Sequence, residues 1–327
     1  MAEAVSDRAW LQAMLDVEAA LGGPALEAAD FDLAALGRAG AEHASPVVPL
    51  AERFRDTHAG ATSQDILDTA MMLVARRALA PLLEDAGAAA DGAASLAERF
   101  REAPVMGRTL MQPALPTSFG LKAAGWMTAL DEACAQLRAA PLTVQMGGPV
   151  GHRDPAVAAA LAGALELEEP VLPWHTDRVR PARLACALGV LAGALAKVAR
   201  DVTLSPWLRE VDPDPAHPRG GSSSMAHKRN PVAAVSVLAC ARRVPGLVAT
   251  MLAAMEQEHE RAAGAWQAEW GTLTDLLRLT GSAAAWGRDL LENLEVDTEA
   301  MRADAGEQPD LGAAGELVDR ALREHRR

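Results

Sequence analysis

The segment GGSSSMAHKRNP, residues 220–231, concentrates residue types that can bind an anion and move a proton. Lys228 and Arg229 supply positive charge, and Asn230-Pro231 is typical of a helix start, with an N-cap followed by proline at the first helical position. The N–H groups of such a helix start add positive potential. Serine is a poor base, and its alkoxide becomes accessible only where cations and N–H donors stabilise negative charge. The segment therefore predicts an anion site with a serine acid/base, and the alternative interpretation is a flexible linker.

A second polar cluster, Thr62-Ser63-Gln64-Asp65, opens a predicted helix. Thr62 followed three residues later by Asp65 resembles a capping box with a short acid, which would be a purely structural role. The functional alternative is that Thr62, Ser63 and the free N–H groups of the helix start bind a carboxylate. His58 precedes the cluster and is either part of that site or an ordinary loop histidine.

Other charged residues are less specific. Two groups are as compatible with solvated surface as with a site, namely His175 with Arg178 and Arg180, and His259 with Glu260 and Arg261. The histidines and cysteines lack the spacings of zinc sites, and no phosphate-binding glycine loop or nucleophile-elbow pattern occurs. We therefore expect no metal and no cofactor.

The composition favours a soluble helical protein that does not bind nucleic acid. Half of the 327 residues are hydrophobic, only 3% are aromatic and tyrosine is absent, so alanine and leucine must fill the core. The net charge of −13 leaves no basic surplus for phosphates. Because neither a signal-peptide pattern nor an uncharged run of membrane-spanning length is visible, we expect a cytoplasmic protein without a membrane partner. The cysteines are expected to be buried free thiols: Cys134, Cys186 and Cys240.

The elements that must position these residues are helices. Apolar residues alternate at steps of four and three in three segments, 184–202, 119–137 and 266–280, as in the seams of a helix bundle. Residues 232–260 also read as a helix, which Pro245 should kink. No convincing strand run is present, so the predicted fold class is all-α, with long helices side by side.

Three motifs in the same order resemble the shared regions of the fumarase/aspartase superfamily. GGSSSMAHKRNP resembles its GSSxMPxKxNP signature, HAGATSQD its first shared region and GRTLMQPALP its second. Other segments, such as PWHTDRVR and EQEHERAAGAWQAEWGTL, resemble the bacterial 3-carboxy-cis,cis-muconate cycloisomerase branch. The resemblance implies a homotetramer around a central helix bundle, with each active site shared among three subunits. It also implies β-elimination, or its reverse, through a carbanion stabilised by an adjacent carboxylate.

The resemblance also implies roles for individual residues. Ser222 matches the mobile catalytic serine, Lys228 and Asn230 the substrate-anchoring pair, and Thr62 and Ser63 the carboxylate-binding pair. Further candidates for the substrate pocket, with weaker support, are His58, Gln145, His175, Arg178 and Arg261. The expected ligand is a small polycarboxylate. The expected regions are an N-terminal helical region 1–65, a central bundle 66–285 and a C-terminal helical remnant 286–327.

The chain departs from the superfamily pattern in an informative way. Ala226 stands where the signature has proline, and Leu110 stands where fumarase and adenylosuccinate lyase carry a histidine that can protonate a poor leaving group. Leucine cannot do so, but a carboxylate with a pKa near ~4 leaves without protonation. This fits a cycloisomerase that converts 3-carboxy-cis,cis-muconate to a carboxymuconolactone. It fits equally a lyase that expels a stable anion from a substituted succinate to give fumarate. A non-catalytic helical assembly protein is the third interpretation, because segments after Leu21, before Arg219 and after Met301 look shortened.

Overall fold

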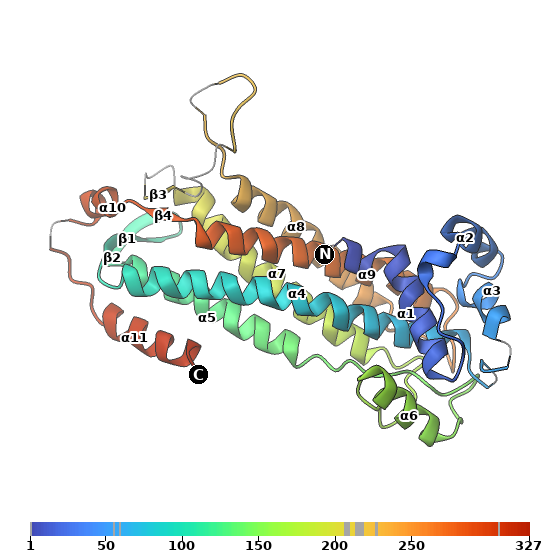
Figure 1. Ribbon diagram of the computed structural model, residues 1–327. Coiled ribbons are helices and arrows are strands. Elements are labelled where there is room, and N and C mark those ends of the chain that lie inside the picture. The colour runs from blue at the N-terminus through green and yellow to red at the C-terminus, as the bar shows by residue number, and fades with distance from the viewer. Residues whose placement is uncertain are drawn as a thin grey trace. The chain divides into compact units, whose positions relative to one another are not determined.

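The computed structural model describes residues 2–54, 56–58, 60–205, 210–212, 219–225, 228–306 and 308–327. Long helices dominate it (Figure 1), and the predicted all-α fold class is confirmed. The long helices are α4 (Ser63–Arg99), α5 (Phe119–Arg138), α7 (Val179–Leu204), α8 (Val232–Ala253) and α9 (Ala265–Glu292). The shorter helices are α1 (Asp7–Ala20), α2 (Leu33–Ala41), α3 (Val47–Ala51), α6 (Pro155–Leu165), α10 (Thr298–Ala305) and α11 (Ala314–His325).

The apolar seams read from the sequence form the core. All six seam residues of α7 are at most 2% exposed: Leu184, Leu188, Leu191, Leu195, Val198 and Val202. The α5 seam is buried as well, and Phe119 at its start makes edge-to-face contacts with Phe100 and Trp126, at ring-centroid distances of 5.8 and 5.7 Å. The seam of α9 is buried except for Trp270, which is half-buried. Side-chain periodicity therefore predicted the packed faces of these helices correctly.

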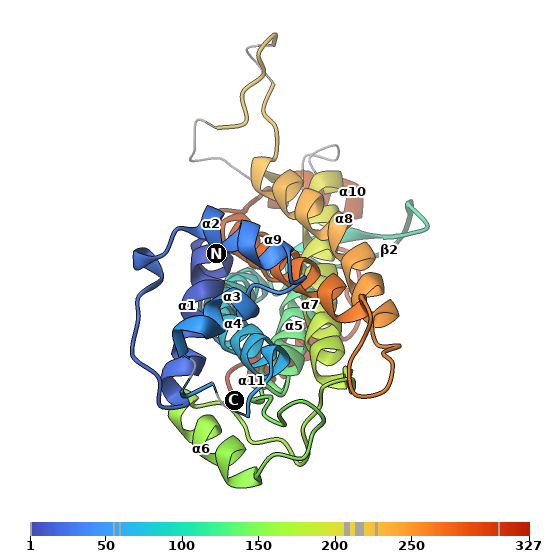
Figure 2. The same ribbon diagram turned by 90° about the vertical axis from the view of Figure 1, so that its right-hand side faces the viewer.

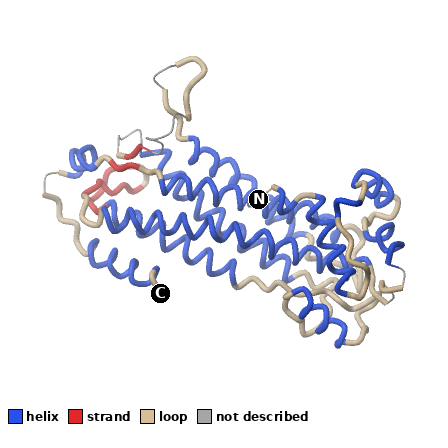
Figure 3. The backbone as a smooth tube through the Cα atoms, viewed as in Figure 1, coloured by secondary structure: helices blue, strands red, loops and turns tan. Residues whose placement is uncertain are grey.

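Two short antiparallel strand pairs were not expected from the sequence (Figure 3). β1 (Pro104–Thr109) pairs with β2 (Gln112–Ser118), and β3 (Val211–Asp212) pairs with β4 (Glu295–Val296). The β1–β2 hairpin carries three prolines and no regular alternation of apolar residues, which is why its sequence does not read as strand. The expectation of no strand was wrong for these two pairs.

The helix predicted over 232–260 is shorter than expected. α8 ends at Ala253, although Pro245 does lie inside it as predicted. At the other end α8 begins at Val232, one residue later than the predicted first helical position, Pro231. The Asn230 amide donates to the Gly220 carbonyl instead of accepting from the helix start, so the predicted N-cap is wrong.

The chain divides into two compact units. Unit 1 comprises Met1–Pro81, Ala139–Cys186 and Pro245–Arg278, and unit 2 comprises Leu82–Arg138, Ala187–Val244 and Leu279–Arg327. Helices α4, α7, α8 and α9 contribute residues to both units. The three regions expected from the sequence follow chain order rather than compactness, so that division stays a prediction.

Two features of the long helices bear on the sequence expectations, namely their apolar character and the burial of their cysteines. By length and composition α7 and α8 are each apolar enough to cross a membrane, with a mean hydropathy of 1.6, because they carry few charged residues. The apolar window of α7 is 56% buried within the chain, whereas that of α8 is only 28% buried. All the cysteines are free, but only Cys134 is buried, while Cys186 and Cys240 are half-buried. The expectation of buried thiols was therefore right for one of the three.

Candidate active site

The start of α4 in unit 1 is organised by the carboxylate of Asp65, which is fully buried. Its Oδ1 accepts hydrogen bonds from Gln145 Nε2 and the Gly147 N–H, both at 3.0 Å, and its Oδ2 accepts from the N–H groups of Gly148 and Thr62, both at 2.9 Å. The Thr62 contact is the acidic half of the predicted capping box. Three of these donors, the Gln145 side chain and the N–H groups of Gly147 and Gly148, thus tie the 145–148 turn to the first turn of α4, and Gly148 adopts a φ of 68° there.

The side chain of Gln145 is committed to this frame. It is fully buried, donates to Asp65, and accepts a 2.7 Å hydrogen bond from the Trp174 N–H through its Oε1. Its main chain exchanges two 2.9 Å hydrogen bonds with the Thr69 hydroxyl. With its amide oxygen and one amide N–H engaged, Gln145 holds the loop, and its expected contact with substrate stays a prediction.

Arg178 lies in a buried ion cluster with Asp68 and Glu269, and all three side chains are at most 1% exposed. Arg178 Nη1 lies 2.7 Å from Asp68 Oδ2, and Nη2 lies 2.5 Å from Glu269 Oε2. Trp266 Nε1 donates to Asp68 at 2.9 Å, and the Trp174 ring lies 4.8 Å from the guanidinium carbon. Both carboxylates therefore share one cation, and each also accepts a hydrogen bond from a neutral donor, Asp68 from Trp266 and Glu269 from Gln257.

The electrostatics of this cluster follow from its burial and its charges. Burial opposes the charge of Arg178, but the charge of Asp68 and the hydrogen bonds to Glu269 and Asp68 outweigh it and raise the pKa of Arg178 above its ordinary value. Burial raises the pKa of the Glu269 carboxyl, with Arg178 opposing. One cation against two carboxylates leaves a net negative cluster, so Arg178 stays protonated and Glu269 is a carboxyl that is costly to ionise.

This cluster positions His175. Arg178 Nη1 and Gln64 Nε2 both donate to the His175 carbonyl oxygen, at 3.0 and 2.7 Å. The His175 ring is 6% exposed, and its Nε2 lies 3.3 Å from Asp65 Oδ1 without the geometry of a hydrogen bond. The Arg178 guanidinium is therefore engaged with the His175 carbonyl and two carboxylates, and its expected contact with substrate stays a prediction.

His58 is held by a carboxylate from another helix. His58 Nδ1 lies 2.6 Å from Glu18 Oε1 of α1, and the Glu18 side chain is fully buried while that of His58 is 18% exposed. A carboxylate at Nδ1 favours the tautomer with the proton on Nδ1, which leaves Nε2 free for a ligand. Figure 2 shows α1 and the first turns of α4 close together in unit 1. The Ala61 N–H donates to the His58 carbonyl oxygen at 2.9 Å, so this histidine is joined to the start of α4.

The Arg261 side chain contacts the loop that follows Gln145 in unit 1 through a backbone carbonyl. Its Nη2 donates to the Pro149 carbonyl at 3.1 Å, and the Thr176 hydroxyl donates to the His259 carbonyl at 2.6 Å. These contacts join the loops around 145–155, 173–181 and 254–264. All seven candidates outside the serine loop therefore lie in unit 1: His58, Thr62, Ser63, Gln145, His175, Arg178 and Arg261.

The serine loop belongs to unit 2. Its base is closed by Asn230, whose N–H and Nδ2 both donate to the Gly220 carbonyl oxygen at 2.8 Å. Gly220 has a φ of 81°, and a Cβ there would overlap the Asn230 carbonyl oxygen. The described residues of the loop extend away from the start of α8 in both views (Figures 1 and 2). Ala226 and His227 lie outside the described residues, so the structure does not bear on the departure at Ala226.

Within this loop the Ser222 hydroxyl is held by backbone N–H donors. Its Oγ accepts hydrogen bonds from the N–H groups of Ser224 and Met225, at 3.3 and 3.2 Å. Such donors stabilise negative charge that develops on the oxygen. Lys228 is exposed and forms no ion pair with any described residue, so its charge is available to an anion.

Comparison with known proteins identifies the family. Residues 41–246 match the family described as lyase. The chain is 43% identical to a 3-carboxy-cis,cis-muconate cycloisomerase of Bradyrhizobium diazoefficiens, over 93% of this chain and 76% of that protein. The chain belongs to the lyase family of the fumarase/aspartase superfamily. Among solved structures, this lyase-family chain superposes on the 3-carboxy-cis,cis-muconate lactonizing enzyme from Pseudomonas putida with a TM-score of 0.91 and 33% identity, covering 99% of this chain and 96% of that one. It is also 39% identical to a nitrosuccinate lyase of Streptomyces davaonensis, over 92% of this chain and 73% of that protein.

Sequence reasoning missed the buried carboxylates that support the candidates in this lyase-family chain. Glu18, Asp68 and Glu269 are fully buried, and each holds a histidine or an arginine on the candidate list. A usable signal existed, because each acid stands among apolar residues of a helical stripe, where an unpaired carboxylate is rare. The partner of each acid could not be read from the chain, since the pairs are 40 to 110 residues apart.

Proposed function

We propose that this lyase-family chain converts 3-carboxy-cis,cis-muconate to a carboxymuconolactone. In that direction a substrate carboxylate oxygen forms a C–O bond to one carbon of a double bond, and the neighbouring carbon takes up a proton, so no atoms leave. The reverse reaction removes that proton and expels the carboxylate. The observation that supports this proposal most strongly is the 43% identity to a cycloisomerase over 93% of the chain.

The geometry supports a role for each group. Ser222 delivers the proton in the lactonising direction and removes it in reverse, with two N–H donors at its oxygen. Lys228 and the N–H groups at the start of α4 hold substrate carboxylates and the negative charge of the carbanion. His58, with Nε2 free, faces the same ligand from the loop before Thr62. Arg178 and Gln145 act through the residues that they position.

The hairpin turn supports chemistry without a strong acid at the leaving group. Leu110 and Met111 form the turn between β1 and β2, and Leu110 is 96% exposed. An apolar side chain there offers no proton to a leaving group. The carboxylate expelled in the reverse reaction needs none, because its pKa is near ~4.

A homotetramer with active sites shared between subunits is part of the proposal. α8 is long and apolar, yet only 28% of its apolar window is buried within the chain, and its exposed side chains include Val235 and Leu252. A stripe of this kind is expected to be covered by other copies. A monomer mass in light scattering at micromolar concentration would contradict it. A cytoplasmic location stays a prediction of the sequence.

The test of the chemistry is steady-state kinetics on purified protein, followed by ultraviolet absorbance of the muconate. Ser222→Ala is expected to lower kcat by at least ~100-fold, the usual lower scale for losing a general acid/base, with binding and folding nearly intact. Lys228→Ala is expected to weaken both binding and turnover, since its charge acts on ground and transition states alike. Ser223→Ala is the matched control, because its exposed hydroxyl makes no hydrogen bond to any described residue. Near-normal turnover by Ser222→Ala would show that Ser222 is not the acid/base.

A second candidate function is elimination of a stable anion from a substituted succinate to give fumarate. The 39% identity to a nitrosuccinate lyase favours it, and the apolar hairpin turn suits it equally, since nitrite also leaves without protonation. The same protein is incubated with nitrosuccinate while fumarate absorbance and nitrite release are followed. Turnover of the succinate alone would replace the first proposal by this one. A folded oligomer without turnover on a broad dicarboxylate panel would favour a non-catalytic assembly protein.

A further inference from the structure

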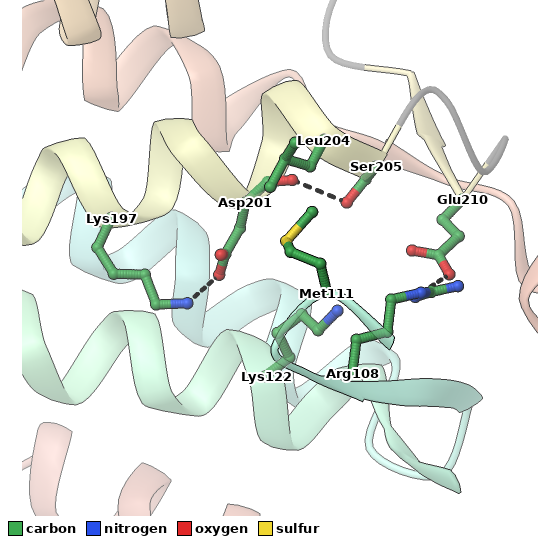
Figure 4. A pocket seen from close by; sticks show the side chains of 8 residues that line it. All are labelled: Arg108, Met111, Lys122, Lys197, Asp201, Leu204, Ser205 and Glu210. Atoms are coloured by element: carbon green, nitrogen blue, oxygen red, sulfur yellow. Dashed lines mark hydrogen bonds and ion pairs between the residues drawn. The ribbon is translucent and has the colours of Figure 1, made fainter. Parts of the chain in front are cut away.

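A cavity of 380 Å³ lies in unit 2, between the β1–β2 hairpin, α5 and the end of α7 (Figure 4). Its lining includes Arg108, Met111, Lys122, Lys197, Asp201 and Glu210, together with Leu204 and Ser205. The volume falls within the range of small-molecule sites. None of the residues proposed to bind substrate or move a proton lines it, although Met111 adjoins Leu110 in the hairpin turn.

The charges around the cavity are paired except for one. Arg108 Nη1 lies 2.7 Å from Glu210 Oε1, an ion pair whose angle is not that of a hydrogen bond. Lys197 pairs with Asp201, which also accepts a 2.8 Å hydrogen bond from Trp126 Nε1. Lys122, on α5, forms no ion pair or hydrogen bond with any described residue, although it is half-buried. Its amine lies beside Met111 and Arg108 in the close-up (Figure 4).

The choice of lysine at this position is informative. Of the 31 basic residues only three are lysines, and two of them, Lys122 and Lys197, line this cavity. Arginine is a broad, permanently charged fork, whereas the ammonium of lysine is compact and can lose its proton when buried. In a chain that uses arginine for almost all its positive charge, a half-buried lysine without an ion-pair partner is suited to a ligand that arrives and leaves.

We propose that this cavity binds a small organic monocarboxylate, with the carboxylate on the Lys122 ammonium and the apolar body against Met111 and Leu204. One unpaired cation matches one carboxylate, since a second carboxylate would meet Glu210 or Asp201. The apolar wall disfavours an inorganic anion, which would lose hydration without gaining contacts. This site is additional to the proposed active site and does not depend on the reaction catalysed there.

Binding at this site is coupled to a proton. Burial lowers the pKa of Lys122 below its ordinary value of 10.5, and the nearby Glu210 and Asp201 charges only partly oppose this, while Arg108 and Lys197 add to it. A bound carboxylate favours the charged amine and raises that pKa again. The affinity should therefore fall as the pH rises through the lowered pKa of the free amine, earlier than for a solvent-exposed lysine.

Isothermal titration of the intact protein with benzoate tests the proposal, and a Kd on the order of 1 mM is expected for so small a ligand. Lys122→Met keeps the length of the side chain and removes the charge, so it should weaken binding roughly 10- to 100-fold, as for loss of a hydrogen bond to a charged group. Lys228→Met, which impairs the proposed active site, should retain this binding. Benzoate bound equally well by Lys122→Met, or not bound by the wild type, would overturn the proposal.

Lysine modification gives an independent readout that does not require a variant to fold. With three lysines, the peptide carrying Lys122 is readily followed by mass spectrometry after reaction with trinitrobenzenesulfonate. Benzoate should slow modification of Lys122 several-fold and leave Lys228 unchanged. Protection of Lys228 alone would show that benzoate enters only the substrate site, and would refute the cavity as a binding site while leaving the proposed function standing.

Discussion

Replacing Arg178 by methionine tests the claim that a buried ion cluster supports the site. The substitution keeps much of the aliphatic volume but removes the one cation that faces both Asp68 and Glu269. It also removes the 3.0 Å hydrogen bond to the His175 carbonyl. Two fully buried carboxylates are left without a counter-charge.

The expected loss of stability is large and depends on pH. Breaking a buried ion pair by removing one partner costs about 3–5 kcal/mol, and two orphaned carboxylates place Arg178→Met at the upper end of that range near neutral pH. Burial already raises the pKa of Glu269 above its ordinary 4.5, and loss of Arg178 raises it further. The folded variant then binds protons more tightly than the unfolded chain. Its stability should therefore recover as the pH falls from neutrality towards 4.5.

The assay is urea unfolding at one fixed protein concentration, at a series of pH values from neutrality down towards the ordinary carboxyl pKa of 4.5. Arg326→Met is the control, because its 3.0 Å ion pair with Glu98 is exposed on both sides and should contribute less than about 1 kcal/mol. A loss below about 1 kcal/mol for Arg178→Met, or a loss that does not change with pH, would refute the reasoning.

Three further predictions concern the loops and the core. Gly220→Ala should lower kcat at least ~10-fold, because the added Cβ opens the base of the serine loop. Gly221→Ala is the control, since its added Cβ has nothing within 4 Å and should leave kcat unchanged. Equal steady-state kinetics for the two variants would contradict this. Replacing Leu110-Met111 by Asn-Gly should raise the free energy of unfolding by about 1–2 kcal/mol, because the φ values of 49° and 66° at these positions strain Leu and Met but suit Asn and Gly. Urea unfolding measures the change. An unchanged midpoint would show that the turn is not strained. Cys134, 2% exposed and with its pKa raised by burial, should react with a thiol reagent only after unfolding, and labelling of the native protein would argue against this packing.

The helices and their buried faces could be predicted from sequence because their signal is local. A seam such as 184–202 is decided by the spacing of apolar residues along one element, and burial followed that spacing closely. The β1–β2 hairpin could not be predicted, since it forms at a turn whose Leu110 and Met111 adopt a left-handed conformation that neither residue favours. Asn230 shows the same limit at a helix start, where a contact ten residues away replaced the expected cap.

The set of candidate site residues stays a prediction, but the structure shows which of their side chains are engaged with other protein groups. Thr62, Ser63 and Ser222 stand in short contiguous motifs, so their expected roles can be inferred from neighbouring residues in the sequence. The role of Arg178 cannot be inferred in this way, because its charge is paired by Asp68 and Glu269, which are 110 and 91 residues away in the sequence. The sequence therefore identified which cations could serve a polycarboxylate, and only the fold shows which of them are already neutralised.

That distinction bears on how a chain of net charge −13 binds a polycarboxylate. The negative net charge gives the protein no overall attraction for an anion, so a polycarboxylate must be bound by positive groups that are not already paired with a protein carboxylate. Arg178 forms ion pairs with Asp68 and Glu269, and Arg108 forms one with Glu210. Among the described candidate residues, the cations without a carboxylate partner include Arg261 of unit 1, which donates to the Pro149 carbonyl, and the exposed Lys228 of unit 2. In the proposed reaction Lys228 binds the anion and Ser222 moves the proton, and because both stand in one loop, binding and proton transfer depend on the same segment.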